Sequence, residues 1–260
     1  MLPTVSSAFV MIAKAGGSAE GAENTLSAIA AALAVSPPGW ARLALEIDVR
    51  LSADGALVAH HDATLERTTN GKGLVRAQPF ERLRQLSAGP GGEPMPRLEE
   101  VYERIGDHEL VVELHDSEPI VVHELVRTLA RLPPAARQQL ILASEHTGVV
   151  RALRDLDPGL RTAATAPEAW RKLLLERLRL ERWAPRGHVW MVPARHRGVQ
   201  VVTRRFAESA ARAGDDVWVF VVDDAQEALR LRRLGASGCF TTRPRALCRA
   251  LQAVAGPLPP

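Results

Sequence analysis

Two short stretches of the sequence place carboxylates inside otherwise apolar runs. The stretch LEIDVRL (45–51) carries Glu46 and Asp48, and ELVVEL (109–114) carries Glu113 near its end. Residues two apart on a β-strand point to the same side, so Glu46 and Asp48 would repel each other unless a cation lay between them. A divalent metal ion that takes oxygen ligands is the natural occupant of such a group.

A histidine near these carboxylates would extend the chemistry. His61 lies at the end of a short apolar stretch, whereas His60 points to the opposite strand face and is expected to be a packing or a surface residue. A metal held by carboxylates polarises phosphoryl oxygens, and an imidazole moves a proton, so the set favours cleavage of a phosphate ester. Two other interpretations of Glu46 and Asp48 stay open: a solvated face of an antiparallel sheet, or a buried ion pair with an arginine.

The elements that must position these side chains alternate between strand and helix patterns. We expect eight strands, at residues 9–13, 43–51, 109–114, 139–144, 160–166, 188–193, 217–222 and 238–242. Segments with helical spacing of apolar residues separate them, which indicates a parallel sheet. Eight such units in about 250 residues match a (β/α)8 TIM barrel. A doubly wound open sheet is the alternative, but no GxGxxG motif follows any of these strands.

One connection is longer than a barrel requires. After the second strand, SADG (52–55) predicts a tight turn and ALVAHHD (56–62) a short return strand. Residues 62–97 are rich in turn formers and too long for an ordinary connection. We therefore expect an insertion over the carboxyl-terminal mouth of a single domain spanning residues 1–260, with positive φ favoured at Asn70-Gly71. Residues 167–183 predict one outer helix with a charged, solvated face.

Composition excludes several classes of partner. The formal net charge is +3, but no run of Lys and Arg is interleaved with aromatic residues, so no nucleic-acid surface is expected. The first apolar run is too short for a signal peptide or a membrane span. Cys239 and Cys248 form no zinc spacing or disulfide framework and suit a reducing compartment. We expect a cytoplasmic protein without stable membrane insertion, and nothing in the sequence fixes an oligomeric state.

Several longer motifs resemble the glycerophosphodiester phosphodiesterase family in order and spacing. They are AENTLSAI (22–29), LEIDVRLSADGALVAHHDATLERTTNGKG (45–73), PRLEEV (96–101) and VWVFVVDDAQEALRLRRLGASGCFTTRP (217–244). The resemblance implies a barrel with a small insertion after the second strand. It also implies hydrolysis of glycerophosphodiesters to glycerol 3-phosphate and an alcohol, with one bound Ca or Mg ion. By the same resemblance, Glu46, Asp48 and Glu113 ligate the metal, and His61 is one of two catalytic histidines.

Other positions depart from the pattern of that family, and they gather at one end of the expected barrel. The departures are Lys14 and Ala15 in place of His-Arg after the first strand, His115 in place of a lysine after the third, Phe220 in place of a tryptophan in the seventh, and Thr242 in place of an aspartate after the eighth. The missing arginine makes a changed phosphodiester substrate plausible.

Two functional hypotheses follow. In the first, the chain is an active phosphodiesterase with an altered acid/base set. Lys14 then acts as an acid/base group after losing its proton beside the metal, or binds phosphate as a point charge. His115 moves a proton or binds phosphate, and Phe220 lines the side that binds the substrate's alcohol. In the second hypothesis, Lys14 replaces the metal, and an inactive barrel binds a phosphorylated ligand or a protein partner.

Overall fold

The chain alternates strands and helices throughout residues 8–185 and 189–254, which are the residues that the computed structural model describes. The strands are β1 (Phe9–Ala13), β2 (Ala41–Leu51), β3 (Leu57–Ala59), β4 (Glu109–Leu114), β5 (Leu140–Ala143), β6 (Arg161–Thr162), β7 (Val189–Pro193), β8 (Arg195–His196), β9 (Val199–Gln200), β10 (Asp216–Phe220) and β11 (Gly238–Thr241). The α-helices are α1 (Leu26–Leu33), α2 (Phe80–Arg84), α3 (Leu98–Ile105), α4 (Pro119–Leu129), α5 (Ala136–Gln139), α6 (Thr147–Leu156), α7 (Ala166–Arg177), α8 (Arg204–Ala213), α9 (Ala225–Leu234) and α10 (Pro244–Val254). Three short 3-10 helices are η1 (Lys14–Gly16), η2 (Val75–Ala77) and η3 (Glu181–Trp183).

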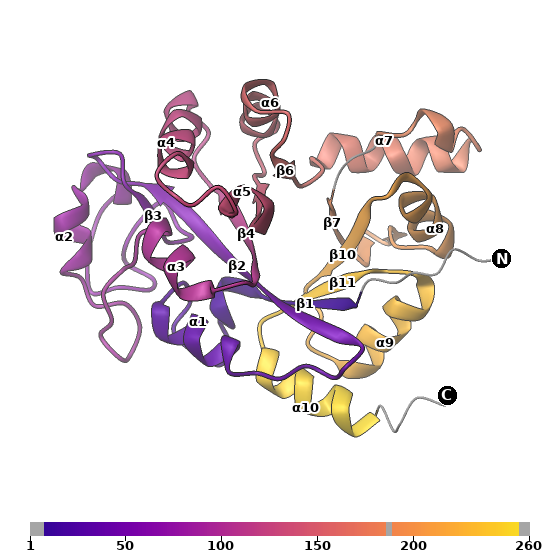
Figure 1. Cartoon of the computed structure of the whole chain (residues 1–260), viewed down its shortest axis with the longest axis horizontal. Helices are drawn as coiled ribbons and strands as arrows, with labels where there is room; N and C mark the ends of the chain where they lie inside the picture. Colours follow the sequence, from indigo (N-terminus) through magenta and orange to yellow (C-terminus); the bar gives the residue numbers. More distant parts are fainter. Residues whose placement is uncertain (1–7, 186–188, 255–260) are drawn as a thin grey trace.

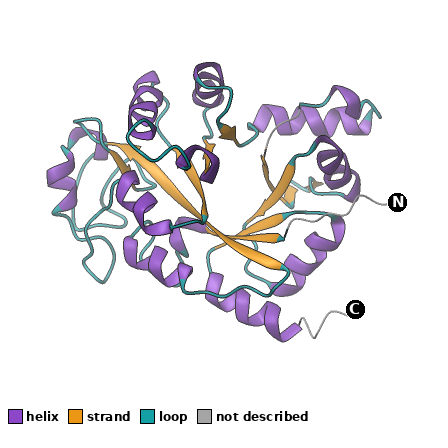
Figure 2. Cartoon of the chain, in the orientation of Figure 1, coloured by secondary structure: helices purple, strands orange, loops and turns teal. Residues whose placement is uncertain are grey.

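Eight of the described strands run parallel and nearly close into a barrel. Their order in the sheet is β6-β5-β4-β2-β1-β11-β10-β7, and a parallel bridge between Ala163 and Val189 brings the two ends of the sheet together. The helices lie around the outside of the strands (Figures 1 and 2). The expected (β/α)8 barrel is confirmed, and the alternative of an open doubly wound sheet is wrong because the terminal strands meet.

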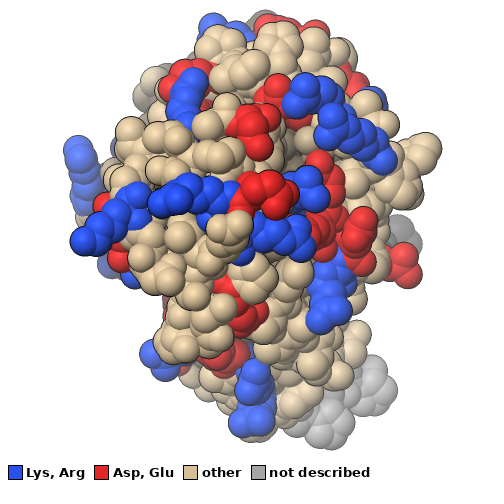
Figure 3. Space-filling model, turned by 90° about the vertical axis from the view of Figure 1, so that its left-hand side faces the viewer, with Lys and Arg blue, Asp and Glu red and all other residues tan. Residues whose placement is uncertain are grey.

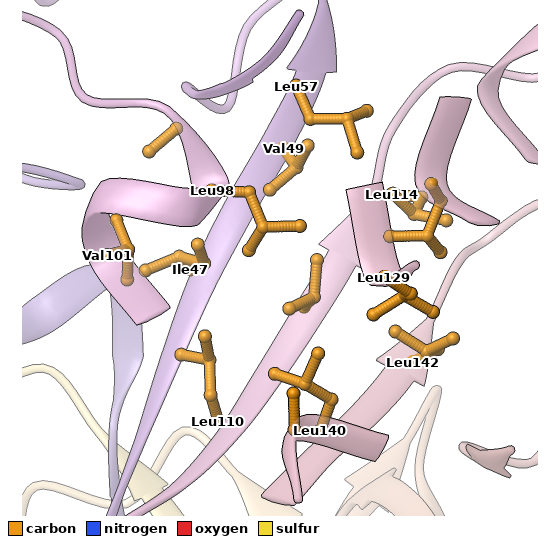
Figure 4. Close-up of a cluster of buried hydrophobic side chains, with 14 of the residues drawn as sticks. Ile47, Val49, Leu57, Leu98, Val101, Leu110, Leu114, Leu129, Leu140 and Leu142 are labelled. Carbon is orange, nitrogen blue, oxygen red and sulfur yellow. The ribbon is translucent and has the colours of Figure 1, made fainter. Parts of the chain in front are cut away.

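Alternation along each strand sorts its residues into an outer and an inner apolar layer. On β2, Ile47 and Val49 belong to the outer layer and pack against α3 residues such as Val101 (Figure 4). Ala44 belongs instead to an inner cluster that contains Val111 of β4 and residues from most other strands. Because side chains two apart share a face, the inner face of β2 continues from Ala44 to the two carboxylates.

A short hairpin follows β2 as the sequence predicts. Strand β3 pairs antiparallel with β2, and the turn between them includes Gly55 at φ 83. Residues 62–97 contain η2 and α2 and pack around their own apolar cluster, which includes Phe80 and Leu83. The positive φ that Asn70-Gly71 permits does not occur at those residues but at Gly73. Gly71 is instead a point of close packing, where a Cβ would lie 2.6 Å from a Leu86 methyl carbon.

Several expected elements end earlier in the structure than the sequence predicts, and the two largest differences are in one strand and one helix. The strands expected at 139–144, 217–222 and 238–242 end one or two residues early, as β5, β10 and β11. The strand expected at 160–166 is only β6, because Thr165 leaves the sheet and caps α7 together with Glu168. The outer helix expected at 167–183 ends at Arg177, since Arg179 adopts φ 58 and the chain resumes as η3. The strand expected at 188–193 begins at Val189, and His188 lies outside the described residues.

The outer surface carries both signs of charge. On the side of the molecule that holds α2, basic and acidic side chains lie interspersed (Figure 3). Such a mixture differs from the single-sign stripe of a nucleic-acid-binding face. Among the described helices, none combines the length and the apolar content needed to cross a bilayer.

Candidate active site

The acidic residues of β2 and β4 converge at the carboxyl-terminal end of the strands. Asp48 is the register partner of Glu113, and one oxygen from each of Glu46, Asp48 and Glu113 lies within 4.8 Å of the others. Glu46 and Asp48 are each 1% exposed. A solvated sheet face is therefore wrong for this pair, and we call the three residues the acidic cluster.

A lysine is the cation that faces the acidic cluster. Lys14 Nζ lies 3.1 Å from Glu46 Oε1 and 4.0 Å from an oxygen of both Asp48 and Glu113. The lysine follows β1, whose last residues pair with β2. The alternative of an arginine paired with Glu46 and Asp48 is wrong. Because β1 lies beside β2, the lysine that follows β1 faces these carboxylates instead.

The backbone of η1 adds a second contact to the same carboxylate. The Ala15 N–H donates to Glu46 Oε2 at 2.5 Å, and Ala15 adopts φ 49, in the left-handed region. This conformation is uncommon for a residue with a Cβ and is a recognised feature of functional sites. The turn after β1 therefore supplies both a charge and a backbone donor to Glu46.

Burial and neighbouring charges shift the ionisation of this group. Burial raises the pKa of Glu46 to about 8, and the charge of Asp48 adds to that effect. Burial also disfavours the charged form of Asp48, but hydrogen bonds from His115 and Asn24 and the charge of Lys14 outweigh it and lower the pKa to about 2. For Lys14, burial favours the neutral amine, yet the charges of the acidic cluster dominate and raise its pKa above the ordinary value. We therefore expect Asp48 to be ionised and Lys14 to be protonated at neutral pH.

Asp48 is held from two sides. Asn24 Nδ2 donates to Asp48 Oδ2 at 2.9 Å, and Asn24 Oδ1 accepts from the Asp48 N–H at 3.0 Å. His115 Nε2 lies 2.8 Å from Asp48 Oδ1. The role of Asn24 was missed from the sequence, although it lies in the AENTLSAI motif, because its partner is 24 positions away and is identified only by the fold.

His61 lies at the edge of the cluster, on the loop after β3. Its ring centroid is 4.6 Å from that of His115, and its Nδ1 is 2.7 Å from Asp62 Oδ1. Asp62 accepts from Arg67 Nε at 2.6 Å, and Arg67 also donates to both carboxylate oxygens of Glu23. This chain of contacts orients the His61 imidazole from the insertion side.

An arginine on β2 ties together the two loops that carry the histidines. Arg50 Nε donates to the His61 carbonyl at 2.9 Å, and Nη1 donates to the His115 carbonyl at 2.7 Å. Asp116 accepts from Arg50 and from the Leu51 N–H. Arg50 shares a strand face with Glu46 and Asp48, which is the signal in the sequence that could have identified it.

The remaining departures from the family pattern lie at the mouth of the barrel. Phe220 ends β10, is 41% exposed and packs edge-on to Phe240 at 6.3 Å between ring centroids. Thr242 donates to Asp223 through both its N–H and its hydroxyl group. His60 is buried with its Nε2 2.9 Å from the Thr64 carbonyl oxygen, as expected of a packing residue.

Comparison with known proteins supplies relatives for this arrangement. A glycerophosphodiester phosphodiesterase of Caldanaerobacter subterraneus subsp. tengcongensis is 27% identical over 253 residues, which cover 92% of this chain and 96% of the relative. A putative glycerophosphodiester phosphodiesterase of Bacillus subtilis is 28% identical over 246 residues, covering 90% and 94% of the two chains.

Solved structures share the same fold. The glycerophosphoryl diester phosphodiesterase domain of an uncharacterized Mycobacterium tuberculosis protein superposes with a TM-score of 0.78 at 19% identity, covering 94% of this chain and 98% of that one. An Oleispira antarctica phosphodiesterase in complex with the product sn-glycerol-3-phosphate gives a TM-score of 0.71 at 26% identity, covering 93% and 96%. The model of the glycerophosphoryl diester phosphodiesterase family matches residues 15–246. This chain therefore belongs to the glycerophosphoryl diester phosphodiesterase family.

Proposed function

We propose that the chain hydrolyses a glycerophosphodiester or a related small phosphodiester. The observation that carries the proposal is the convergence of Glu46, Asp48, Glu113 and His61 at the carboxyl ends of the strands, where barrel enzymes place their chemistry. The Caldanaerobacter relative bears the name of this activity, and the Oleispira phosphodiesterase was solved with its product sn-glycerol-3-phosphate.

The acidic cluster fits one divalent cation by the chemistry of its donors. It offers only carboxylate oxygens, which suit Ca²⁺ and Mg²⁺. Burial, with the charge of Asp48 adding to it, raises the pKa of Glu46, so a bound dication would stabilise the ionised form of this carboxylate. We propose Glu46, Asp48 and Glu113 as the metal ligands. A bound ion would polarise the phosphoryl oxygens and offset the charge that develops on them.

The side chains around the cluster have distinct proposed roles. His61, oriented by Asp62, moves a proton to or from a substrate oxygen. Lys14 binds a phosphoryl oxygen as a point charge, because its raised pKa opposes service as a base. His115 holds Asp48 and lies close enough to His61 to assist in proton transfer. Phe220, half-exposed at the mouth, lines the side that receives the alcohol.

The insertion and the cellular setting complete this proposal. We propose that residues 62–97 form one wall of the substrate site, because Ala63, Leu74 and Val75 line a cavity of about 280 Å³ together with Arg50 and His115. We also propose a cytoplasmic location, since Cys239 and Cys248 are both buried free thiols that suit a reducing compartment.

Hydrolysis assays test the proposal directly. Purified protein is incubated with glycerophosphodiesters and Mg²⁺ or Ca²⁺, and release of glycerol 3-phosphate is measured. His61→Gln should lower kcat by roughly 10²–10⁴-fold, the usual worth of a general acid or base. Glu46→Gln should weaken metal binding and lower the metal-dependent rate, while Glu227→Gln, on the exposed face of α9, should change neither kcat nor the metal requirement. Wild-type rates no higher than those of the His61 variant would contradict the proposal.

One observation favours a second candidate function. Lys14 Nζ is within 4.0 Å of all three carboxylates, so the ammonium group can serve as the cation that balances the acidic cluster. In that case the chain is an inactive barrel that binds a phosphorylated ligand or a protein partner. Calorimetry with Ca²⁺ and Mg²⁺ separates the two candidates: the second predicts no heat of binding in the wild type and no hydrolysis of any diester.

A further inference from the structure

A second group of potential metal ligands shares only Asp48 with the acidic cluster. One ligand atom from each of Asp48, His61 and His115 lies within 4.8 Å of the others. Two imidazoles and one carboxylate form a mixed nitrogen and oxygen donor set, unlike the oxygen-only set of Glu46, Asp48 and Glu113. His115 creates this set, because it stands where the family pattern has a lysine, which offers no ligand comparable to a neutral imidazole.

We propose that Asp48, His61 and His115 bind a borderline-soft transition-metal dication, such as Zn²⁺, at a site distinct from the acidic cluster. Imidazole nitrogen suits Zn²⁺ and its neighbours in the first transition row, whereas Ca²⁺ and Mg²⁺ prefer oxygen. Catalytic Zn²⁺ sites also have three protein ligands and leave the fourth position open to water or substrate. The site rests on the side-chain geometry and not on the proposed hydrolysis.

The contacts around these ligands orient them as the surroundings of metal sites do. Asp62 Oδ1 lies 2.7 Å from His61 Nδ1 and accepts its hydrogen bond, which leaves the lone pair of Nε2 free to bind a metal. A carboxylate behind a ligating histidine fixes both the tautomer and the ring. Asn24 fixes the other oxygen of Asp48, and Arg50 ties the His61 and His115 carbonyl oxygens to β2.

Binding requires only a small adjustment of the side chains. His115 Nε2 and Asp48 Oδ1 are 2.8 Å apart. Two ligands that bind a tetrahedral ion at about 2.0–2.1 Å stand about 3.3 Å from each other. The imidazole therefore moves outward by a few tenths of an ångström, and it can do so because His61, its ring neighbour at 4.6 Å, is on an exposed loop.

Occupation of this site would inhibit the proposed phosphodiesterase. Asp48 belongs to both donor sets, so a transition metal competes with Ca²⁺ or Mg²⁺ for the same carboxylate. The same metal also engages the His61 lone pair that proton transfer needs. This consequence, unlike the site itself, rests on the proposed function.

Spectroscopy with Co²⁺ tests the site without reference to activity. The full chain, freed of metals by a chelator, is titrated with Co²⁺, and the visible absorption of the tetrahedral or five-coordinate ion is recorded. Zn²⁺ affinity is then measured by calorimetry. We expect one ion per chain, and a loss of Zn²⁺ affinity of at least about 100-fold in His115→Lys, which restores the family's residue. His123→Gln, exposed on α4, is the matched control and should bind as the wild type does.

Two further variants keep the outcome decisive. His61→Gln removes a ligand from an exposed position and should lower Zn²⁺ affinity even if His115→Lys fails to fold. Glu46→Gln should lower Zn²⁺ affinity far less than His61→Gln does, because Glu46 lies beside the site without being one of its ligands. Equal Zn²⁺ affinity in the wild type and His61→Gln, or a loss in Glu46→Gln as large as in His61→Gln, overturns the inference. Zn²⁺ binding without any hydrolysis would leave the site standing and reject the proposed function, while hydrolysis without His-dependent Zn²⁺ binding would do the reverse.

Discussion

At the scale of single residues, the ammonium group of Lys14 is the positive charge that faces the acidic cluster. Its Nζ faces three carboxylates, and two of them, on Glu46 and Asp48, are almost fully buried. Removing one partner of a buried ion pair leaves an uncompensated charge, which usually costs several kcal/mol. Lys14 therefore contributes to stability whether or not it also contacts substrate.

The first prediction concerns Lys14→Met. In the presence of a chelator, this variant should unfold at a lower temperature than the wild type, by about 5–10 °C for a loss near 3 kcal/mol. Excess Ca²⁺ or Mg²⁺ should raise the Tm of the variant more than that of the wild type, because the ion no longer competes with an ammonium group. Thermal melts with and without the ion provide the measurement.

Lys72→Met is the matched control, since Lys72 is an exposed lysine in the insertion. It should melt with the wild type under both conditions. If Lys14→Met and Lys72→Met behave alike, the acidic cluster does not depend on Lys14 for its charge balance.

The sequence predicts some site residues and not others for a definite reason. Glu46, Asp48 and Glu113 are visible because carboxylates interrupt apolar strands, and period-two alternation assigns them to one face. The contacts of Asn24 and Arg50 are not visible, because their partners lie on other segments and depend on register and loop paths. The cation that faces Glu46 was also open, since it depends on which strand lies beside β2.

At the scale of elements, the strand faces explain why the site lies where it does. The inner apolar layer formed by Ala44 and Val111 fills the barrel, and the next inward positions on β2 and β4 carry the carboxylates. Strand order and most strand bounds follow from the sequence, because apolar alternation is strong there. The end of α7 does not, since the apolar spacing continues past Arg177, whereas Leu178 and Leu180 lie exposed in the structure.

The second prediction concerns Arg50, which connects β2 to the loops that carry both histidines. Arg50→Met should lower the free energy of unfolding by about 1.5–3 kcal/mol, because charge-assisted hydrogen bonds to the carbonyl oxygens of His61 and His115 and to Asp116 are lost. Urea titration gives this value. Arg230→Met removes an exposed ion pair with Glu227 on α9, and this change should alter the free energy of unfolding by less than about 1 kcal/mol.

The arrangement of the loops offers a second readout for Arg50. If Arg50 positions the histidines, Arg50→Met should also weaken Zn²⁺ binding, although Arg50 is not a ligand. An unaltered Zn²⁺ affinity together with lost stability would restrict Arg50 to a structural role.

At the scale of the whole molecule, the opposite end of the barrel is braced by ion pairs. Glu109, at the start of β4, lies 2.5 Å from Arg42 of β2 and 2.6 Å from Arg161 of β6. Burial opposes the ionisation of Glu109, but these two guanidinium groups outweigh it and lower its pKa below the ordinary 4.5. Residues at the amino-terminal end of a barrel serve stability and not chemistry.

The third prediction follows from the sign of that shift. A carboxyl group whose pKa is lower in the folded state contributes stability that is fully present above the unfolded pKa and is lost as the pH falls through the folded value. The stability difference between the wild type and Glu109→Gln should therefore be largest near neutral pH and shrink as the pH drops from about 6 to about 3. Urea titrations across this range give the measurement, and a difference that grows on acidification would contradict it.

The closing contact of the barrel has a consequence for how the molecule opens. β6 contains two residues, and within the described residues the chain just after it meets β7 at the bridge Ala163–Val189, which includes the hydrogen bond from the Ala164 N–H to the Val189 carbonyl oxygen. By contrast, β2 and β4 are joined along six residues. The barrel is joined less extensively between β6 and β7 than between its central strands. The backbone amides of β6 and β7 should therefore exchange with deuterated solvent faster than those of the central strands. Because β4, β2 and β1 lie in the middle of the sheet order, the barrel can open between β6 and β7 while the strands that carry the acidic cluster stay paired.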